Sequence, residues 1–126
     1  MSGDSAKQFS SARYIALETY KKNGQAVLTP VWVLEDGGTV FVRTDPRSWK
    51  AKRIRRNPHV RIAPSDMRGR PKGPWFDGEA HFIEGVDADR VLKLITKKYG
   101  IGGEILEFFN RLRGADPTGV ISITVK

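Results

Sequence analysis

A basic run between residues 43 and 56 is the part of this sequence best suited to chemistry. Ser48 and Lys50 fall in the first turn of a helix predicted over residues 47–56. There, unpaired backbone N–H groups and the positive end of the helix dipole favour an anion. Thr44 adds a hydroxyl just upstream. The segment therefore predicts a phosphate cradle, and its cations are Arg43, Arg47, Lys50, Lys52, Arg53, Arg55 and Arg56.

A solvated, charged helix face is the plainer interpretation of such a run. Lys52, Arg55 and Arg56 would share one face at helical spacing, as surface cations often do. However, cations near a helix N-terminus oppose the dipole, and a bound anion would offset that cost. This placement favours a phosphate over a merely solvated surface.

The three tryptophans and two breaks in the pattern are a second set of candidates. Trp49 is expected in the core, whereas Trp75 follows a long basic loop (residues 64–74) and is placed to stack on a ring or an interface. Pro30 cannot donate to a strand ladder, so it marks an edge, a bulge or a break. Near Pro30 and Gly73, backbone groups would be free to bond a heterocycle.

Other kinds of catalytic site find little support. The sequence has no cysteine, and His59 and His81 match no metal spacing, so no metal site is predicted. The glycine cluster GIGG at 100–103 does not follow a strand, so the dinucleotide fingerprint fails. No acid, base or nucleophile stands out, and the catalytic residues stay unknown. A bound cofactor would then have to carry any chemistry.

Period-two patterns and turn residues predict a mainly β fold with a few short helices. About six antiparallel strands, in short hairpins, suggest a split barrel whose closure removes exposed edges. Strands are expected over residues 13–20, 26–34, 39–44, 59–63, 75–84 and 119–125, and helices over 47–56, 88–99 and 104–113. Residues 13–126 would form one domain, with 1–12 as a flexible lead.

The overall composition limits the kinds of ligand and the location that we expect for this chain. The formal net charge of +8 over 126 residues attracts phosphate esters, acidic cofactors or nucleic acid. No apolar run approaches the length of a membrane helix. The lack of cysteine fits the reducing cytoplasm, which is the expected location.

Four segments together resemble the pyridoxamine-phosphate-oxidase-like, FMN-binding split-barrel family, and more narrowly its branch of deazaflavin (F-420)-dependent enzymes. They are TPVW at 29–32, VRT at 42–44, SWKAKRIRRNP at 48–58 and VRIAP at 60–64. The resemblance extends from about Arg13 to the last strand. Two positions depart from the branch, which often has cysteine at Ser65 and glycine at Trp49.

The resemblance implies a homodimer with two cofactor sites at the subunit interface. It implies a phosphate held by Thr44, Ser48, Lys50, Lys52 and, less directly, Arg56. The ring would lie against the backbone of the second strand, with Trp75 approaching from the partner subunit. The residues assigned to the ring are Thr29, Pro30, Val31, Trp32 and Pro64, together with Trp75.

Three functions remain open at this stage. The first is hydride transfer from a reduced deazaflavin or FMN to a small conjugated substrate. The deazaflavin is favoured because its acidic tail would use the surplus of cations at Arg55, Arg56, Arg68, Arg70 and Lys72. The second is a non-catalytic flavin or deazaflavin carrier or sensor. The third is a basic nucleic-acid-binding barrel, which lacks aromatics interleaved with the charges on a strand face.

Overall fold

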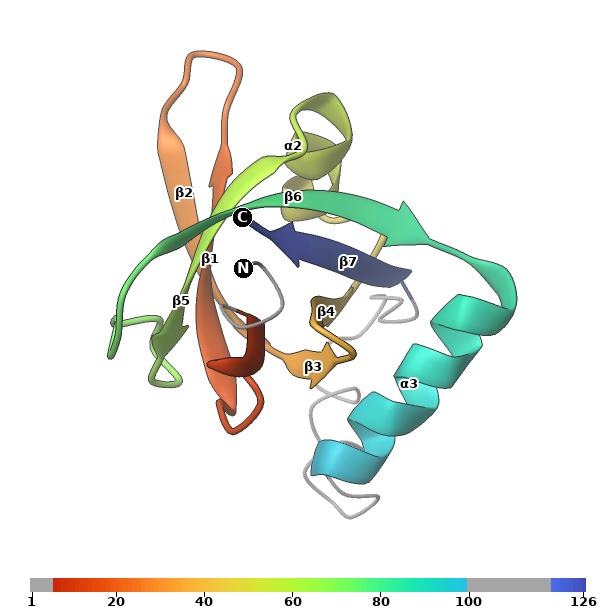
Figure 1. Cartoon of the computed structure of the whole chain (residues 1–126). Helices are drawn as coiled ribbons and strands as arrows, with labels where there is room; N and C mark the ends of the chain where they lie inside the picture. Colours follow the sequence, from red (N-terminus) through yellow and green to blue (C-terminus); the bar gives the residue numbers. More distant parts are fainter. Residues whose placement is uncertain (1–5, 100–118) are drawn as a thin grey trace.

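The computed structural model describes residues 6–99 and 119–126. Seven antiparallel strands form one sheet in the order β2-β1-β5-β6-β7-β4-β3. Two helices, α2 and α3, accompany the sheet (Figure 1). The elements are β1 (Tyr14–Tyr20), β2 (Ala26–Trp32), β3 (Leu34–Asp36), β4 (Thr39–Thr44), α2 (Trp49–Arg56), β5 (His59–Ser65), β6 (Phe76–Ile83), α3 (Gly85–Tyr99) and β7 (Gly119–Val125).

A single residue joins the two edges of this sheet. The edge strands β2 and β3 are adjacent in sequence and separated only by Val33, which is fully buried. The chain therefore pairs with β1 as far as Trp32 and with β4 from Leu34 onward. The sheet curls round until its two edges meet. Such closure leaves few unpaired edges. The predicted mainly β split barrel is confirmed, with seven strands rather than about six.

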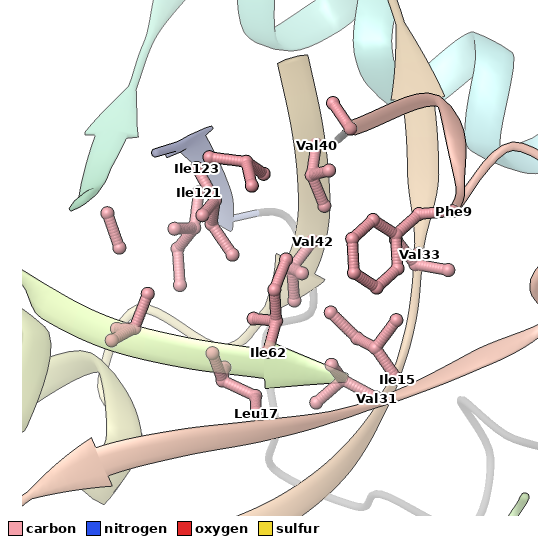
Figure 2. Close-up of a cluster of buried hydrophobic side chains, with 14 of the residues drawn as sticks. Phe9, Ile15, Leu17, Val31, Val33, Val40, Val42, Ile62, Ile121 and Ile123 are labelled. Atoms are coloured by element: carbon pink, nitrogen blue, oxygen red, sulfur yellow. The ribbon is translucent and has the colours of Figure 1, made fainter. Parts of the chain in front are cut away.

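The inside of the barrel is filled by apolar side chains from the long strands, most of them branched aliphatic, and β6 contributes Ala80. Figure 2 shows them converging, and those labelled include Ile15, Leu17, Val42, Ile62, Ile121 and Ile123. Burial of this kind of apolar surface is the main force that holds a small barrel together. The alternation expected for half-buried strands is what allows one face of each strand to enter this core.

The N-terminal lead takes part in the core, contrary to the expectation of a flexible segment over residues 1–12. Ala6 and Phe9 are fully buried, and Phe9 packs edge-on against Phe76 with ring centroids 5.8 Å apart. A single large aromatic that closes one end of a barrel leaves no periodic signal in the sequence. Its burial is therefore visible only in the structure.

Helix α3 lies on the outside of the sheet, where it makes a second apolar cluster (Figure 1). Its Val91, Ile95 and Tyr99 pack against Leu34 and Phe41 of β3 and β4. The apolar stripe predicted over residues 88–99 is confirmed, although the helix begins earlier, at Gly85. None of the helices in the described part of the chain is long and apolar enough to cross a bilayer.

Several predicted boundaries shift for local reasons. The strand expected over 26–34 is broken at Val33 into β2 and β3. Gly78 lies in the middle of β6 and pairs in register with both Val60 and Val125. It is a point of close approach, since a Cβ there would lie 2.8 Å from the Ile123 side chain. The helix predicted over 104–113 lies outside the described residues.

Candidate functional site

The start of α2 has the geometry of a capped helix N-terminus. Ser48 is extended (φ −68°, ψ 162°), and its hydroxyl accepts a hydrogen bond from the Ala51 N–H at 3.2 Å. Serine is a preferred N-cap residue because it satisfies one of the unpaired N–H groups of the first turn. No acidic residue lies in that turn. The positive end of the helix dipole is therefore not offset from within the helix.

Lys50 lies over this helix start and reaches back to the end of β4. Its Nζ donates to Thr44 Oγ1 at 3.0 Å, and Thr44 is itself buried. Burial lowers the pKa of Lys50, and repulsion from Arg53 adds to this effect, while Asp45 opposes it. A partly desolvated ammonium, a buried hydroxyl and a helix start thus meet at one point. The structure brings together Thr44, Ser48 and Lys50, as the sequence predicts.

The other cations of α2 are engaged by the protein itself. Arg53 Nε donates to Thr19 Oγ1 at 2.7 Å, and Arg56 Nη2 donates to the Tyr20 carbonyl at 2.8 Å. These contacts fasten the helix to the end of β1. Arg56 lies at the C-terminal end of α2, so the structure places it about one and a half turns from Lys50.

Trp49 is exposed, contrary to the expectation that it belongs to the core. Its relative exposure is 73%. Lys52 Nζ lies 4.5 Å from the centroid of its ring, a cation–π contact on the helix surface. Ala51 and Ile54 are the buried residues of this helix, and they face the barrel. The first position of α2 therefore points away from the barrel, where a tryptophan has no core to enter.

A second group of the predicted residues gathers around Pro30 and Pro64. Pro30 is exposed on the edge strand β2, which confirms the edge expected for a proline there. Gly69 has φ +85°, and a Cβ on it would lie 3.5 Å from Pro30. A Cβ on Gly73 would lie 3.2 Å from Pro64. The basic loop after β5 is thus folded against both prolines.

Asp66 organises that loop. Its carboxylate accepts from the N–H groups of Arg68 and Arg70 at 2.8 and 3.0 Å, and from Arg70 Nε at 2.8 Å. These hydrogen bonds hold the pKa of the Asp66 carboxyl below its usual value. The side chain of Arg70 is therefore partly used in shaping the loop.

Trp75 belongs to a polar and aromatic cluster on the outer face of β1 and β5. The Arg61 guanidinium lies 4.9 Å from the centroid of the Trp75 ring and 3.4 Å from a Glu18 carboxylate oxygen. Tyr20 Oη donates to Glu18 at 2.7 Å. Burial is the larger cause and the Glu18 carboxylate the next one that raises the pKa of Tyr20 to about 12. Trp75 is thus half-buried within one chain and already stacked on a cation.

Sequence reasoning missed the residues that hold the break between β2 and β3. The Val33 N–H donates to Tyr99 Oη at 2.8 Å, and the same hydroxyl lies 2.7 Å from the Val33 carbonyl. Lys98 Nζ donates to the carbonyls of Ala12 and Val33 at 2.6 and 2.7 Å. The Tyr99 ring stacks on Trp32 at 4.6 Å between centroids. In the sequence, the only sign of this arrangement was the position of Tyr99 at the end of the apolar stripe predicted over residues 88–99.

The cradle and the Pro30 group occupy opposite ends of the barrel. Figure 1 shows α2 at one end and the turn between β5 and β6 at the other. On β1, α2 contacts Thr19 through Arg53, whereas Pro30 pairs with Ala16. Three residues of a strand span about 10 Å. Within one chain, the predicted phosphate and ring residues therefore form two separate groups.

Comparisons with known proteins agree with this architecture. The family model described as pyridoxamine 5′-phosphate oxidase matches residues 3–126. A candidate pyridoxamine 5′-phosphate oxidase from Listeria innocua superposes with a TM-score of 0.66 at 20% identity, over 98% of this chain and 93% of that one. No curated protein matches the chain.

Two further solved structures have the same fold. HutZ, the heme storage protein from Vibrio cholerae, has a TM-score of 0.70 at 16% identity and covers 98% of this chain and 89% of its own. The conserved hypothetical protein Rv2991 from Mycobacterium tuberculosis has a TM-score of 0.68 at 24% identity, over 95% and 76%. At these identities the likeness is one of fold.

Proposed function

The chain belongs to the pyridoxamine 5′-phosphate oxidase family, and we propose that it is an oxidoreductase that binds a flavin or deazaflavin phosphate at the start of α2. One observation carries the proposal. Lys50 is partly desolvated, lies beside the capped N-terminus of α2 and donates to the buried hydroxyl of Thr44. No carboxylate within residues 6–99 and 119–126 is bonded to this ammonium, and such an arrangement is suited to a phosphate.

The residues present fit the phosphate end of such a cofactor. Lys50 Nζ has three donors, of which Thr44 takes one. The N–H groups of the first turn add donors, and Ser48 holds that turn in place. Lys52 lies about one turn after Trp49, and its Nζ lies 4.5 Å from the centroid of the Trp49 ring. When bound, the flavin or deazaflavin supplies the hydride, while the chain supplies binding and orientation.

A second copy of the chain would complete the site. Thr29, Pro30, Val31, Trp32 and Pro64 lie at the far end of the barrel from the cradle, so one chain does not present them beside its own Lys50. A homodimer that sets the cradle of one protomer against the β2 edge of the other would join the two groups. Trp75, on the outer face near that edge, would then face the partner's cofactor.

The deazaflavin is the cofactor that we favour, because of charge. Its acidic tail continues beyond the first phosphate, and the net charge of +8 exceeds what one phosphate needs. Arg68 and Lys72 are exposed on the loop that packs against Pro30. In the proposed dimer, this loop would lie near the partner's cradle and be available to the tail.

The first experiment identifies the cofactor. We expect a purified, stoichiometric ligand with a flavin-like or deazaflavin-like absorbance spectrum, and its mass decides between the two. Stripped protein is then titrated with FMN and with the deazaflavin. Lys50→Ala should weaken both about 10- to 150-fold, since charge-assisted hydrogen bonds to phosphate contribute about 1.5–3 kcal/mol. Lys93→Ala, on the exposed side of α3, is the matched control. Equal titration curves for Lys50→Ala and the wild type would refute the cradle.

The second experiment tests the dimer and the tail. Light scattering should give twice the chain mass, and a monomer with cofactor still bound would exclude the shared site. Deazaflavin should bind more tightly at low than at high ionic strength, because exposed ion pairs are screened. The double variant Arg68→Ala with Arg70→Ala should remove that excess. If FMN binds more tightly and neither salt nor the variant matters, the deazaflavin preference is wrong.

A binding protein without turnover is the alternative. HutZ has this fold and is named for heme storage, so stripped protein is also titrated with haem. Loading with flavin but no reduction of any conjugated acceptor would favour a carrier or sensor. Tight, salt-sensitive binding of random oligonucleotides with no cofactor would favour a nucleic-acid-binding barrel.

A further inference from the structure

A pocket of about 280 Å³ lies between α2 and β6, away from Lys50. Its floor is made by Ile54 and Ala80, both buried, so the barrel core comes to the surface here. Pro58 and Phe82 form apolar walls. Arg55 and His81 stand at the rim, and both are exposed. A pocket near the small end of the usual range for ligand sites accommodates a single ring rather than a flavin.

The cation of this pocket is held in a fixed orientation. The Arg55 guanidinium lies 4.4 Å from the centroid of the Phe82 ring, and its Nη1 donates to the Pro46 carbonyl at 2.6 Å. The carboxylates that form ion pairs within the described part of the chain pair with other residues. A stacked guanidinium with donors to spare is the arrangement that recognises a planar carboxylate.

One backbone hydrogen bond and one side-chain contact hold the surroundings of the pocket. The Ala80 N–H donates to the Pro58 carbonyl at 2.8 Å, which joins β6 to the end of α2. The rim histidine, His81, has its Nε2 2.8 Å from a Glu79 carboxylate oxygen. A rigid apolar floor with a preset cation loses little freedom when a ligand enters.

We propose that this pocket binds a small planar organic anion, an aromatic carboxylate of one ring, with the ring on Phe82 and Pro58 and the carboxylate on Arg55. The ring would cover the apolar floor at Ile54 and Ala80. The guanidinium would add a charge-assisted hydrogen bond that a neutral ring cannot make. Neither the family match nor the proposed phosphate cradle accounts for this pocket.

The pocket shares a wall with the turn that leads to the cradle. Arg55 holds the carbonyl of Pro46, which lies between Thr44 and Ser48. A Cβ on Gly119 would lie 2.7 Å from the Thr44 carbonyl, 3.1 Å from Pro46 and 3.3 Å from Phe82, so these groups are tightly packed. A carboxylate bound to the other donors of Arg55 would shift the guanidinium that holds the Pro46 carbonyl. A ligand in the pocket should therefore change the conformation of the turn before α2.

The test uses benzoate as the probe and the full-length, isotope-labelled protein. Amide shifts are followed by NMR during titration with benzoate, with benzyl alcohol as the neutral ring and acetate as the ringless anion. We expect saturable benzoate shifts at Arg55, His81 and Phe82. Benzyl alcohol and acetate should each bind at least about tenfold more weakly, since each lacks one of the two contacts.

Two variants decide whether the pocket is the cause. Arg55→Gln should weaken benzoate about tenfold, whereas Arg90→Gln on α3 should leave it unchanged. Ala80→Val, which fills the floor, should weaken benzoate and benzyl alcohol alike. If Ala80→Val does not fold, Phe82→Leu takes its place, because it removes the stacking surface from a partly buried position.

The proposal would be overturned by shifts that do not saturate, by equal affinities of benzoate and acetate, or by an unchanged response in Arg55→Gln. Shifts centred on Ser48 and Lys50 would also overturn it, because the anion would then be occupying the cradle. The cofactor titrations use other ligands and other variants, so the two proposals can fail separately.

Discussion

Two lysines at different ends of this molecule are alike in burial and differ in what they bond. Burial is the main cause that lowers the pKa of both Lys50 and Lys98. Lys98 donates to two backbone carbonyls, those of Ala12 and Val33, at the break where the barrel closes. Lys50 donates to one side-chain hydroxyl, that of Thr44, at the start of α2.

The difference separates a cation bonded to two backbone carbonyls from a cation bonded to a single hydroxyl. Desolvating an ammonium is costly unless its three donors are used. At Lys98 the backbone carbonyls of Ala12 and Val33 are the acceptors, so the cost of desolvating its ammonium is offset within the fold. At Lys50 a single hydroxyl does so, and its remaining donors are the basis of the phosphate site proposed above. Burial lowers the pKa of both lysines, and only their hydrogen-bond partners tell them apart.

The largest expected effect is on ligand affinity at Lys50. Lys50→Met keeps the apolar stem and removes the charge. It should weaken phosphate-bearing cofactors about 10- to 150-fold and lower the free energy of unfolding by less than about 1 kcal/mol. Cofactor titration and urea denaturation of the apo protein measure the two quantities. A large loss of stability with unchanged affinity would make Lys50 structural, like Lys98.

Tyr99→Phe should give the opposite pattern. The phenylalanine ring can still stack on Trp32, but the buried Val33 N–H loses its acceptor. Leaving such a group unpaired should lower the free energy of unfolding by about 1–3 kcal/mol. Cofactor affinity should stay within about twofold of the wild type, a difference near 0.4 kcal/mol. Urea denaturation and titration of the same sample check both values, and an unchanged midpoint would contradict the role of Tyr99.

Lys98→Met should resemble Tyr99→Phe with a smaller effect. Two carbonyls lose a charged donor, but the Val33 carbonyl keeps Tyr99 Oη, and a desolvated charge is removed. The net loss of stability should be about 1 kcal/mol, with cofactor affinity unchanged. Lys97→Met, exposed one position earlier on α3, is the matched control. A loss of affinity in Lys98→Met alone would show that the closure point also serves the ligand.

The smallest expected effect is a pH dependence of apo stability. A lysine with a lowered pKa in the folded state carries a penalty at neutral pH, which is relieved as pH rises toward its unfolded value of 10.5. Wild-type stability should therefore rise between pH 8 and about 10, and less so in Lys50→Met and Lys98→Met. The series stops there, because burial raises the pKa of Tyr99 to about 12 and stability falls above pH 10 as unfolded tyrosines ionise. Parallel curves for all three proteins would contradict the shared desolvation.

Local patterns carried much of the fold. Alternation and turn residues such as Asn23-Gly24 and Gly37-Gly38 located most strands, because both depend on a few neighbouring residues. The cradle was also predictable, since Thr44, Ser48 and Lys50 lie within seven positions of one another. One short turn between β4 and α2 is enough to bring such close neighbours together.

Contacts between residues far apart in the sequence could not be predicted from such local patterns. Trp49 was expected inside and is exposed, because its direction depends on which face of α2 meets the barrel. Phe9 was expected in a flexible lead and is buried against Phe76. The bond from Val33 to Tyr99 spans 66 positions. No periodicity within a segment records such a pairing.

The sequence by itself determined the family, most of the strands and the grouping of Thr44, Ser48 and Lys50 at a helix start, because each rests on residue types at short spacing. Only the tertiary structure decided which cations remain for a ligand. Arg53, Arg56 and Lys98 are taken by a hydroxyl or carbonyls from β1 and from the residues around the barrel closure, whereas Lys50 keeps donors in reserve. The sequence shows that a side chain is positively charged, but its hydrogen-bond acceptors come together only when the barrel closes.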